Sequence, residues 1–235
     1  SILRRDLSPD VCSSDLTKLA DYIVLNTYCA NSDWPGKNWY GFRRRAPGEE
    51  FKFLSWDAEY ALENINTNRI NVGGTNTPAR LYDRARQNEE FRLLFADRVH
   101  KHAFNGGALD PNVMRARYAA LANVIDAAMD AEAARWGDNP NTRKGNRDYR
   151  KSDWINARNH VLNNFIPNRH AIAISQYRSA GLYPAVDPPE FNQHGGPLPS
   201  GFELTLASPS IGTVYYTTDG SDPRFSTNAA RSADH

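Results

Sequence analysis

Residues 31–40 read NSDWPGKNWY, and residues 55–57 read SWD. Asp33, Asn38 and Asp57 offer carboxylate and amide oxygens, the kind of donor that Mg²⁺ and Mn²⁺ prefer in proteins. A proline–glycine pair in the middle of the first stretch predicts a loop. The stretch is therefore a candidate cation-binding loop, and the plainer alternative is that Asp33 and Asn38 only cap a turn.

The spacing of these three residues matches the order of side chains in protein-kinase sites. Such sites place an aspartate and an asparagine as D-x-x-x-x-N, and a further aspartate follows a later strand. Asp33 and Asn38 have that spacing, and Asp57 comes 19 residues after Asn38. Phosphoryl transfer needs mainly positioned charge and metal ligands from the protein, which suits these residue types. Spacing alone is a weak signal, because D-x-x-x-x-N arises by chance in many chains.

Two strand-like segments separate Asn38 from Asp57. Residues 38–44 and 50–56 are rich in aromatic and alternating residues, and the turn sequence APGE lies between them. This pattern predicts a two-stranded hairpin whose second strand leads directly into Asp57.

Helices dominate the remainder of the chain up to residue 180. Residues 65–79 are polar, contain two adjacent glycines and predict an exposed loop. Trp136 and Trp154 are expected to pack the helical region rather than to bind sugar. Apolar residues at helical spacing predict helices at residues 17–27, 88–103, 112–136, 151–165 and 168–180.

The composition changes after Gly181. Prolines punctuate the remaining residues, residues 202–206 alternate between apolar and polar, and residues 213–218 are β-branched and aromatic. These patterns predict short strands. We expect a separate all-β module over residues 183–235, truncated to about half the strands that a sandwich needs.

Composition restricts the classes of partner. Hydrophobic residues make up 40% of the 235 residues, so the chain can bury a core. The net charge is +1, which gives no bulk attraction to nucleic acid or anionic lipid. No apolar run approaches the roughly 18 residues needed to cross a bilayer. We therefore expect no nucleic-acid partner and no membrane span in these residues.

Residues 1–16 do not lead naturally into the helical pattern that follows. Residues 7–16 read LSPDVCSSDL and resemble a translated sequencing-adapter peptide, so residues 1–16 are expected to be a non-native leader. The chain does not begin with Met, and we expect a piece of a longer protein. Cys12 and Cys29 cannot form a disulfide framework, and Cys29 is expected to be a buried, unreactive thiol.

Three segments together resemble the CotH (spore coat protein H) kinase family, whose members are atypical kinase-like proteins of bacteria and of some fungal surfaces. The segments are DYIVLN at residues 21–26, NSDWPGKNWY at residues 31–40 and FLSWDAE at residues 53–59. The resemblance covers roughly residues 17–178. It implies an α+β chain in which residues 17–182 form the mostly helical C-terminal part of an atypical protein-kinase-like fold.

By this resemblance Asp33 would be the catalytic base, and Asn38 and Asp57 would hold the metal. The cofactor would be ATP with Mg²⁺ or Mn²⁺, and the acceptor would be a Ser or Thr hydroxyl of a secreted or surface protein. No Phe-Gly follows Asp57 and no His-Arg precedes Asp33, unlike the usual protein-kinase pattern.

The residues that grip ATP in protein kinases are missing from the sequence before Asp33. No glycine-rich loop and no strand lysine stand there. We therefore expect the longer parent to transfer phosphate, and this chain alone to have little or no activity.

The segment GTVYYTTDGSDPR at residues 212–224 resembles the small C-terminal β-sandwich module of chitobiases and β-hexosaminidases. In those enzymes the module is appended away from the catalytic site. It therefore implies a secreted or cell-surface setting, with contact to carbohydrate or cell wall, and no glycosidase activity. Asp219 and Asp222 are expected to cap a turn rather than to form a site.

Two alternatives to phosphoryl transfer stay open. A non-catalytic structural or adhesive surface protein would use the β module for its contacts and would lack Mn²⁺-dependent nucleotide binding. A carbohydrate-active enzyme is less favoured, because it requires two carboxyl groups that face each other across a cleft.

Overall fold

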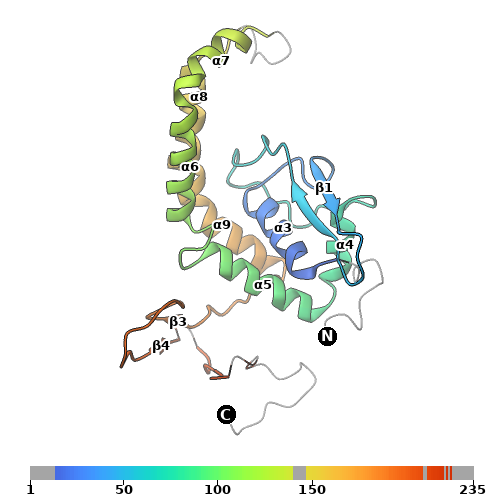
Figure 1. Ribbon diagram of the computed structural model, residues 1–235, viewed down its shortest axis with the longest axis vertical. Coiled ribbons are helices and arrows are strands. Elements are labelled where there is room, and N and C mark those ends of the chain that lie inside the picture. The colour runs from blue at the N-terminus through green and yellow to red at the C-terminus, as the bar shows by residue number, and fades with distance from the viewer. Residues whose placement is uncertain (1–13, 140–146, 209–210, 220, 222, 224–235) are drawn as a thin grey trace. The chain divides into compact units, whose positions relative to one another are not determined.

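The computed structural model describes residues 14–139, 147–208, 211–219, 221 and 223. The chain divides into two compact units, Ser1–Tyr183 and Pro184–His235. The first unit is mostly helical and contains a small antiparallel hairpin, so its described part is α+β (Figure 1). In the first unit the elements are α3 (Leu16–Tyr28), β1 (Trp39–Phe42), β2 (Lys52–Ser55), α4 (Pro78–Ala85), α5 (Glu89–Ala103), α6 (Pro111–Ile125), a 3₁₀ turn (Asp126–Ala128), α7 (Met129–Trp136), α8 (Lys151–His160), a π-helical turn (Val161–Phe165) and α9 (Ile166–Ser179).

Helix α3 is the core element of the first unit. Asp15 caps it by accepting a hydrogen bond from the backbone N–H of Lys18 at 3.0 Å. The helix contacts α4, α5, α9 and β2, and its side chains are buried around most of its circumference. The predicted helix at residues 17–27 is confirmed, and its burial on several sides explains why its sequence is apolar beyond a single stripe.

The hairpin β1–β2 has an inner and an outer face. Its strands pair antiparallel, with Trp39 opposite Ser55 and Tyr40 opposite Leu54. On the inner face, the ring of Phe53 lies 5.9 Å from the ring of Tyr22 in α3. The predicted hairpin is confirmed, although both strands are shorter than the sequence indicated. Its packing on α3 fixes which face is turned inward, because successive side chains of a strand point to opposite sides.

The segment before α4 corrects one prediction. Residues 65–79 were expected to be an exposed loop, yet Ile70 and Ala79 are buried in the core. Helix α4 begins at Pro78, and no helix was predicted there. The helix has only eight residues, so its apolar side chains make too short a pattern for helical spacing to stand out.

The predicted helix at residues 88–103 is confirmed as α5, which begins one residue later. The side chain of Asn88 caps it by accepting from the N–H of Phe91 at 3.2 Å. Arg98 of α5 makes a two-pronged ion pair with Asp21 of α3, with N–O distances of 2.5 and 2.9 Å. His102 also contacts Asp21, at 2.8 Å. This cluster joins the two helices that contact each other most extensively.

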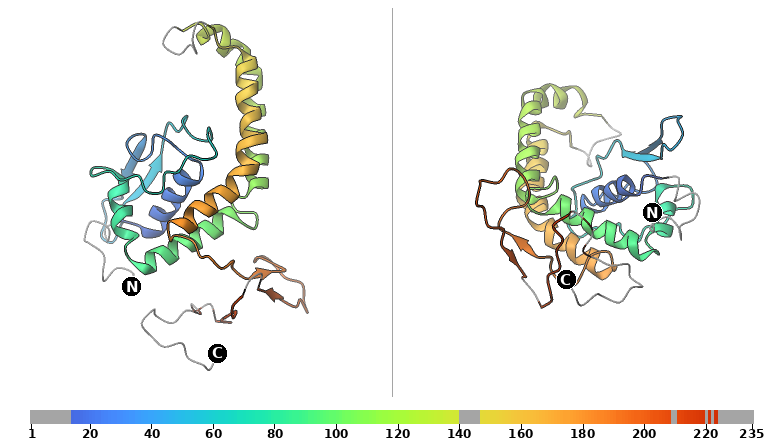
Figure 2. Two further views of the ribbon diagram at one scale, coloured as in Figure 1. Left: turned by 180° about the vertical axis from the view of Figure 1, so that it is seen from behind. Right: turned by 60° about the horizontal axis from the view of Figure 1, so that its bottom comes forward.

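Helices α6 and α7 run beside α8 and α9 (Figures 1 and 2). A single helix was predicted at residues 112–136, but a 3₁₀ turn divides it. Asp126 in that turn pairs with Lys151 at 3.1 Å and with Arg158 at 3.5 Å, both on α8. No proline or glycine marks the division, so it could not be read from the sequence.

Two separate helices were predicted on either side of residue 166, but the structure has a continuous helical run. Pro167 has no N–H, and its ring would clash with the carbonyl four residues earlier in a regular α-helix. The π-helical turn before α9 absorbs this conflict. The side chain of Arg115 donates to the carbonyl of Leu162, which the wider turn leaves without its usual helical donor.

The second unit contains one short ladder among its described residues. Strand β3 (Glu190–Phe191) pairs antiparallel with β4 (Leu206–Ala207). Residues 213–218 were predicted as a strand, but no described strand pairs with them and they are irregular. β-branched residues favour strands only where a neighbouring strand accepts their hydrogen bonds. The predicted sandwich is therefore not seen in the part of this unit that the structure describes.

Residues 14–16 take part in the fold of the first unit. Asp15 donates its N–H to the carbonyl of Phe51 at 2.9 Å, and Leu16 is buried as the first residue of α3. The rest of the predicted leader, with Cys12, lies outside the described residues. Cys29 is a free, partly buried thiol, and burial raises its pKa to about 12, as expected of an unreactive cysteine.

Candidate functional site

The loop between α3 and β1 brings the three predicted site residues together. The side-chain amide of Asn38 donates to Asp33 Oδ2 at 2.8 Å and to the backbone carbonyl of Asp57 at 2.8 Å. Both partners can only accept, so the amide nitrogen must face them. The Oδ1 of Asn38 therefore points away from these two contacts and is available as a ligand atom.

Backbone conformation places Asn38 and Asp57 at the same end of the hairpin. Their φ angles are +56° and +47°, in the left-handed region that asparagine and aspartate enter more readily than most other residues. The N–H of Trp56 donates to the carbonyl of Asn38 at 3.0 Å and closes that end. The peptide bond between Trp34 and Pro35 in the preceding loop is cis.

Buried asparagines anchor the loop to α3 and β2. The N–H and the side-chain amide of Asn31 both donate to Asn26, each at 2.9 Å. Asn26 in turn donates to the hydroxyl of Ser55 at 2.9 Å and to the carbonyl of Tyr22 at 2.8 Å. The N–H of Asp33 completes the set by donating to Asn31 Oδ1 at 3.1 Å. These bonds satisfy polar groups that would be costly to bury unpaired.

Arg69 holds the same loop from the other side. Its Nε donates to the carbonyl of Trp34 at 3.0 Å, and its Nη2 donates to the carbonyl of Ser32 at 2.8 Å and also to that of Trp34. Burial lowers the pKa of Arg69, and the negative charge of Asp33 opposes that shift. Sequence reasoning missed this residue, because it lies in the segment that was predicted to be exposed.

Arg169 of α9 is a second arginine that sequence reasoning missed. It is almost completely buried, and it donates to the carbonyls of Thr27, Tyr28 and Ile65. Burial lowers its pKa. The first two carbonyls end α3, where the helix dipole favours a cation. Arg169 thus ties the end of α3, just before the site loop, to the segment that carries Arg69.

The oxygen donors of this site suit a hard cation. Asp33 and Asp57 carry carboxylates, and Asn38 offers its amide Oδ1. Across the described residues, no group of three or more His, Cys, Asp or Glu side chains is placed to hold a metal ion. An ion here would therefore need water and phosphate oxygens to complete its shell, which is how proteins commonly hold Mg²⁺ at phosphoryl-transfer sites.

A family model described as CotH kinase protein matches residues 13–173. The chain belongs to the CotH kinase protein family. The matched range contains Asp33, Asn38 and Asp57, and the family indicates a kinase-type function. No curated protein and no solved structure matches the chain.

The match ends before the second unit, so the likeness to chitobiase modules rests on residues 212–224. Of these, residues 220, 222 and 224 lie outside the described part of the chain, and Asp222 with them. Asp219 accepts a hydrogen bond from the N–H of Ser221 at 2.9 Å, as expected of a residue that caps a turn.

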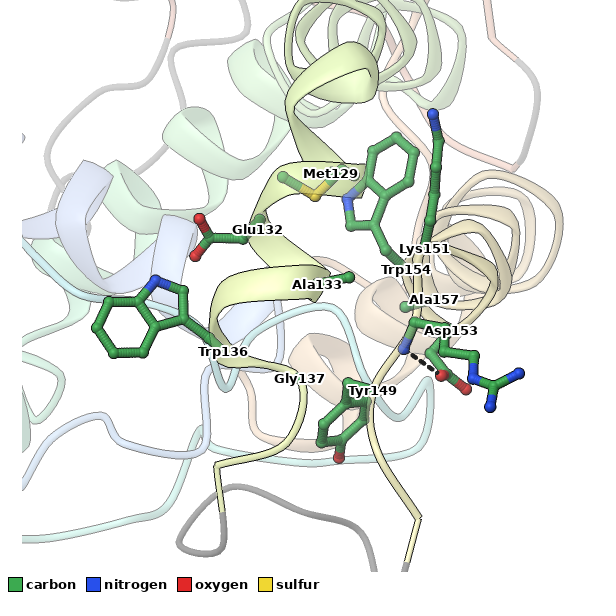
Figure 3. Close-up of a pocket in the computed structure, with 11 residues that line it drawn as sticks. Met129, Glu132, Ala133, Trp136, Gly137, Tyr149, Lys151, Asp153, Trp154 and Ala157 are labelled. Atoms are coloured by element: carbon green, nitrogen blue, oxygen red, sulfur yellow. Dashed lines mark hydrogen bonds between the residues drawn. The ribbon is translucent and has the colours of Figure 1, made fainter.

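A cavity of about 320 Å³ lies between α7 and α8, and Asp33, Asn38 and Asp57 do not line it (Figure 3). Trp154 and Tyr149 contribute to its mostly apolar lining. Trp154 packs against Arg158, whose guanidinium carbon lies 5.1 Å from the ring centre. Trp136 also borders the cavity but is 50% exposed, so it packs the helices less than the sequence suggested.

No described helix combines the length and the apolar character needed to cross a membrane.

Proposed function

We propose that the protein is a metal-dependent kinase that transfers the γ-phosphoryl group of ATP to a Ser or Thr hydroxyl of a secreted or surface protein. The observation that carries this proposal is the pair of hydrogen bonds from Asn38 to Asp33 and to Asp57, in a chain of the CotH family. They join in space the three residues whose spacing first indicated a kinase-type site.

Each of the three residues has a proposed role. Asp33 Oδ2 is engaged by Asn38, so Oδ1 is the oxygen proposed to accept the proton of the acceptor hydroxyl. Asn38 Oδ1 and the Asp57 carboxylate would hold Mg²⁺ or Mn²⁺. When bound, the ion would neutralise charge on the phosphates of ATP. The hydrogen bonds of Asn38 hold its amide against the Asp33 carboxylate and the Asp57 backbone carbonyl.

The outer face of the hairpin supports the nucleotide part of the proposal. Tyr40, Leu54 and Trp56 are 59%, 53% and 57% exposed, and the rings of Tyr40 and Trp56 lie 5.9 Å apart. This apolar surface adjoins Asn38 and Asp57 in the chain. Exposed aromatic side chains suit stacking with a planar base. We propose that the adenine of ATP lies against this face.

The described residues before Asp33 offer little support for tight ATP binding. Residues 14–32 form α3 and its flanks, and they include no strand lysine or glycine-rich loop of the kind that grips phosphates in protein kinases. We propose that these 235 residues by themselves bind ATP weakly and transfer phosphate slowly. The transferase activity is proposed for the whole protein to which they belong.

A non-catalytic role at a cell surface is the second candidate. In the second unit Ile211 and Tyr216 are 97% and 67% exposed. Exposed apolar side chains favour a contact surface, and the chitobiase-like sequence suggests carbohydrate or cell wall as its partner. A secreted or cell-surface location is proposed under both candidates.

A titration with Mn²⁺ tests the metal site. Binding is measured by the decrease in the electron paramagnetic resonance signal of the free ion. We expect the unmodified chain to bind Mn²⁺ and Asp57→Asn to weaken that binding by at least about tenfold. Glu63→Gln is the matched control, because Glu63 is an exposed carboxylate of the same region. Equal affinity in all three proteins would reject the metal role and favour the non-catalytic candidate.

Thiophosphorylation with ATP-γ-S tests the role of Asp33. We expect Asp33→Asn to keep most of the Mn²⁺ binding and to abolish transfer wherever the unmodified protein shows it. Strong labelling by the 235-residue chain that depends on Asp33 would contradict the proposal that this chain alone is slow.

A further inference from the structure

Arg69 contacts the backbone on both sides of Asp33. Its guanidinium binds the carbonyl of Ser32 and the carbonyl of Trp34, the two residues next to Asp33 in the chain. Hydrogen bonds from a charged donor are stronger than neutral ones, and the planar fork of arginine can serve two acceptors at once. Arg69 therefore fixes the peptide groups from which the Asp33 side chain projects.

The other contacts of Asp33 leave its backbone little freedom. Its N–H donates to Asn31 Oδ1 at 3.1 Å, and its carbonyl accepts from the N–H of Lys37 at 3.1 Å. The next side chain, Trp34, is buried with its ring 6.3 Å from that of Tyr82 in α4. Of these restraints, Arg69 is the one that brings a positive charge close to the Asp33 carboxylate.

Arg69 itself stands on a fixed support. The next residue, Ile70, is buried in the core, and its N–H donates to the side chain of Asn68 at 3.0 Å. Because the backbone of Arg69 is held in place, its side chain can position the carbonyl groups that it contacts.

We infer that Arg69 is a positioning residue, which sets the orientation of the Asp33 carboxylate and, through the Asp33–Asn38 hydrogen bond, of the Asn38 amide. The role in catalysis rests on the proposed function, whereas the positioning of Asn38 can be tested without it. A lysine at this position keeps the charge but loses the fork that reaches both carbonyls.

Arg86, the C-cap residue of α4, offers a matched control. It donates to the carbonyl of Ile70 at 3.4 Å and to the side chain of Asn71, so it supports the same segment as Arg69. Its guanidinium also pairs with Asp83 and lies over the ring of Tyr82, both on α4. Arg86→Lys should therefore reproduce any general loosening of this segment, and of the Tyr82 ring that packs on Trp34, without removing a hydrogen bond to the loop of Asp33.

Nuclear magnetic resonance of the Asn38 side-chain amide gives a readout that a merely structural role would not move. Both Asn38 amide protons are hydrogen-bonded in the structure, so they should exchange slowly with water. We expect Arg69→Lys to raise the exchange rate of the proton bound to Asp33 by about tenfold. Mn²⁺ affinity should fall by about tenfold in the same variant. Arg86→Lys should change neither quantity.

The outcomes separate this inference from the proposed function. If Arg69→Lys and Arg86→Lys lower the melting temperature alike and leave the Asn38 signals unchanged, Arg69 is only a structural residue and the inference is wrong. If the Asn38 signals respond as expected but the unmodified chain binds no Mn²⁺, the positioning stands and the metal role fails.

A measurement on the unmodified chain covers the case in which Arg69→Lys does not fold. The Nε–H of Arg69, which donates to Trp34, should exchange far more slowly than the Nε–H of the exposed Arg44. Equal exchange of the two would overturn the inference.

Discussion

The two antiparallel strand pairs in the described part of the chain reach different degrees of order. Hairpin β1–β2 has four-residue strands, and its inner face packs on α3 through Phe53 and Tyr22. Ladder β3–β4 has two residues in each strand, and Phe191 is 37% exposed. The longer strand pair is therefore the one that has a helix covering one face, because two strands alone are marginal in water.

The largest effect should come from removing the inner anchor of the first hairpin. Phe53→Ala deletes the ring that contacts Tyr22 and Trp39, and we expect it to lower the free energy of unfolding by about 2–3 kcal/mol. Denaturant unfolding measures it, followed by tryptophan fluorescence for the first unit and by tyrosine fluorescence for the second unit, which has no tryptophan. Phe191→Ala is the counterpart in the second ladder, where about 0.5 kcal/mol or less is expected. A similar cost for both variants would remove the distinction between the hairpins.

Two asparagines, one buried beside the first hairpin and one exposed beside β3, extend the comparison to hydrogen bonds. Asn26→Ala leaves the buried amide of Asn31 and the hydroxyl of Ser55 without a partner, which should cost about 1–3 kcal/mol. Asn192 makes comparable bonds beside β3, to the backbone of Glu203 and Thr205, but it is exposed to water. Asn192→Ala should change the melting temperature little, since water replaces its bonds. A larger loss from Asn192→Ala would show that burial is not the deciding factor.

The pH dependence of stability tests the α3–α5 contact that supports the first hairpin. Burial would raise the pKa of Asp21, but hydrogen bonds and charges from Arg98 and His102 outweigh it and lower the pKa. A lowered folded-state pKa adds stability above the ordinary aspartate value of about 4, and this stability is lost as pH falls through the lowered pKa.

Asp21→Asn should therefore destabilise the first unit at neutral pH, and the difference from the unmodified chain should shrink below about pH 4. Asp219→Asn is the matched change in the exposed second unit and should leave the melting temperature almost unchanged. Unfolding curves at a series of pH values check both. A difference for Asp21→Asn that persists unchanged at low pH would contradict the ion-pair explanation.

The smallest effect on stability is expected on the outer face of the first hairpin. Tyr40→Ser removes a side chain that is largely exposed, so the free energy of unfolding should change by less than about 0.5 kcal/mol. The same change should weaken ATP binding in the presence of Mn²⁺, because the proposed contact between Tyr40 and the adenine ring is lost. Calorimetry measures this binding. Strong destabilisation by Tyr40→Ser would mean that both faces of the hairpin are structural.

Most of the elements of the first unit could be predicted from sequence. Helices α3 and α5 carry apolar residues at helical spacing and capping side chains, and both appear as expected. The π-helical turn before Pro167 and the 3₁₀ turn at Asp126 could not be predicted. Pro167 predicts a break between two helices and not the wider turn that continues the helix, and no proline or glycine marks the 3₁₀ turn, where Asp126 pairs with Lys151 and Arg158.

The candidate site divides in the same way. Spacing and family resemblance pointed to Asp33, Asn38 and Asp57, and the structure places them in one hydrogen-bonded group, although their chemical roles stay proposals. Arg69 and Arg169 had no local signal, because each acts on carbonyl groups far away in the chain. Every residue has a backbone carbonyl, so the residue types along the chain do not indicate which carbonyl a distant arginine binds.

The sequence by itself determined the α+β character of the first unit, the hairpin between Asn38 and Asp57, and the membership of residues 13–173 in the CotH kinase family. Only the tertiary structure decided which strand pattern is realised and which side chains hold the site loop. Periodicity and spacing describe neighbours along the chain. Burial, pairing and the satisfaction of polar groups depend on neighbours in space, and these exist only once the chain has folded.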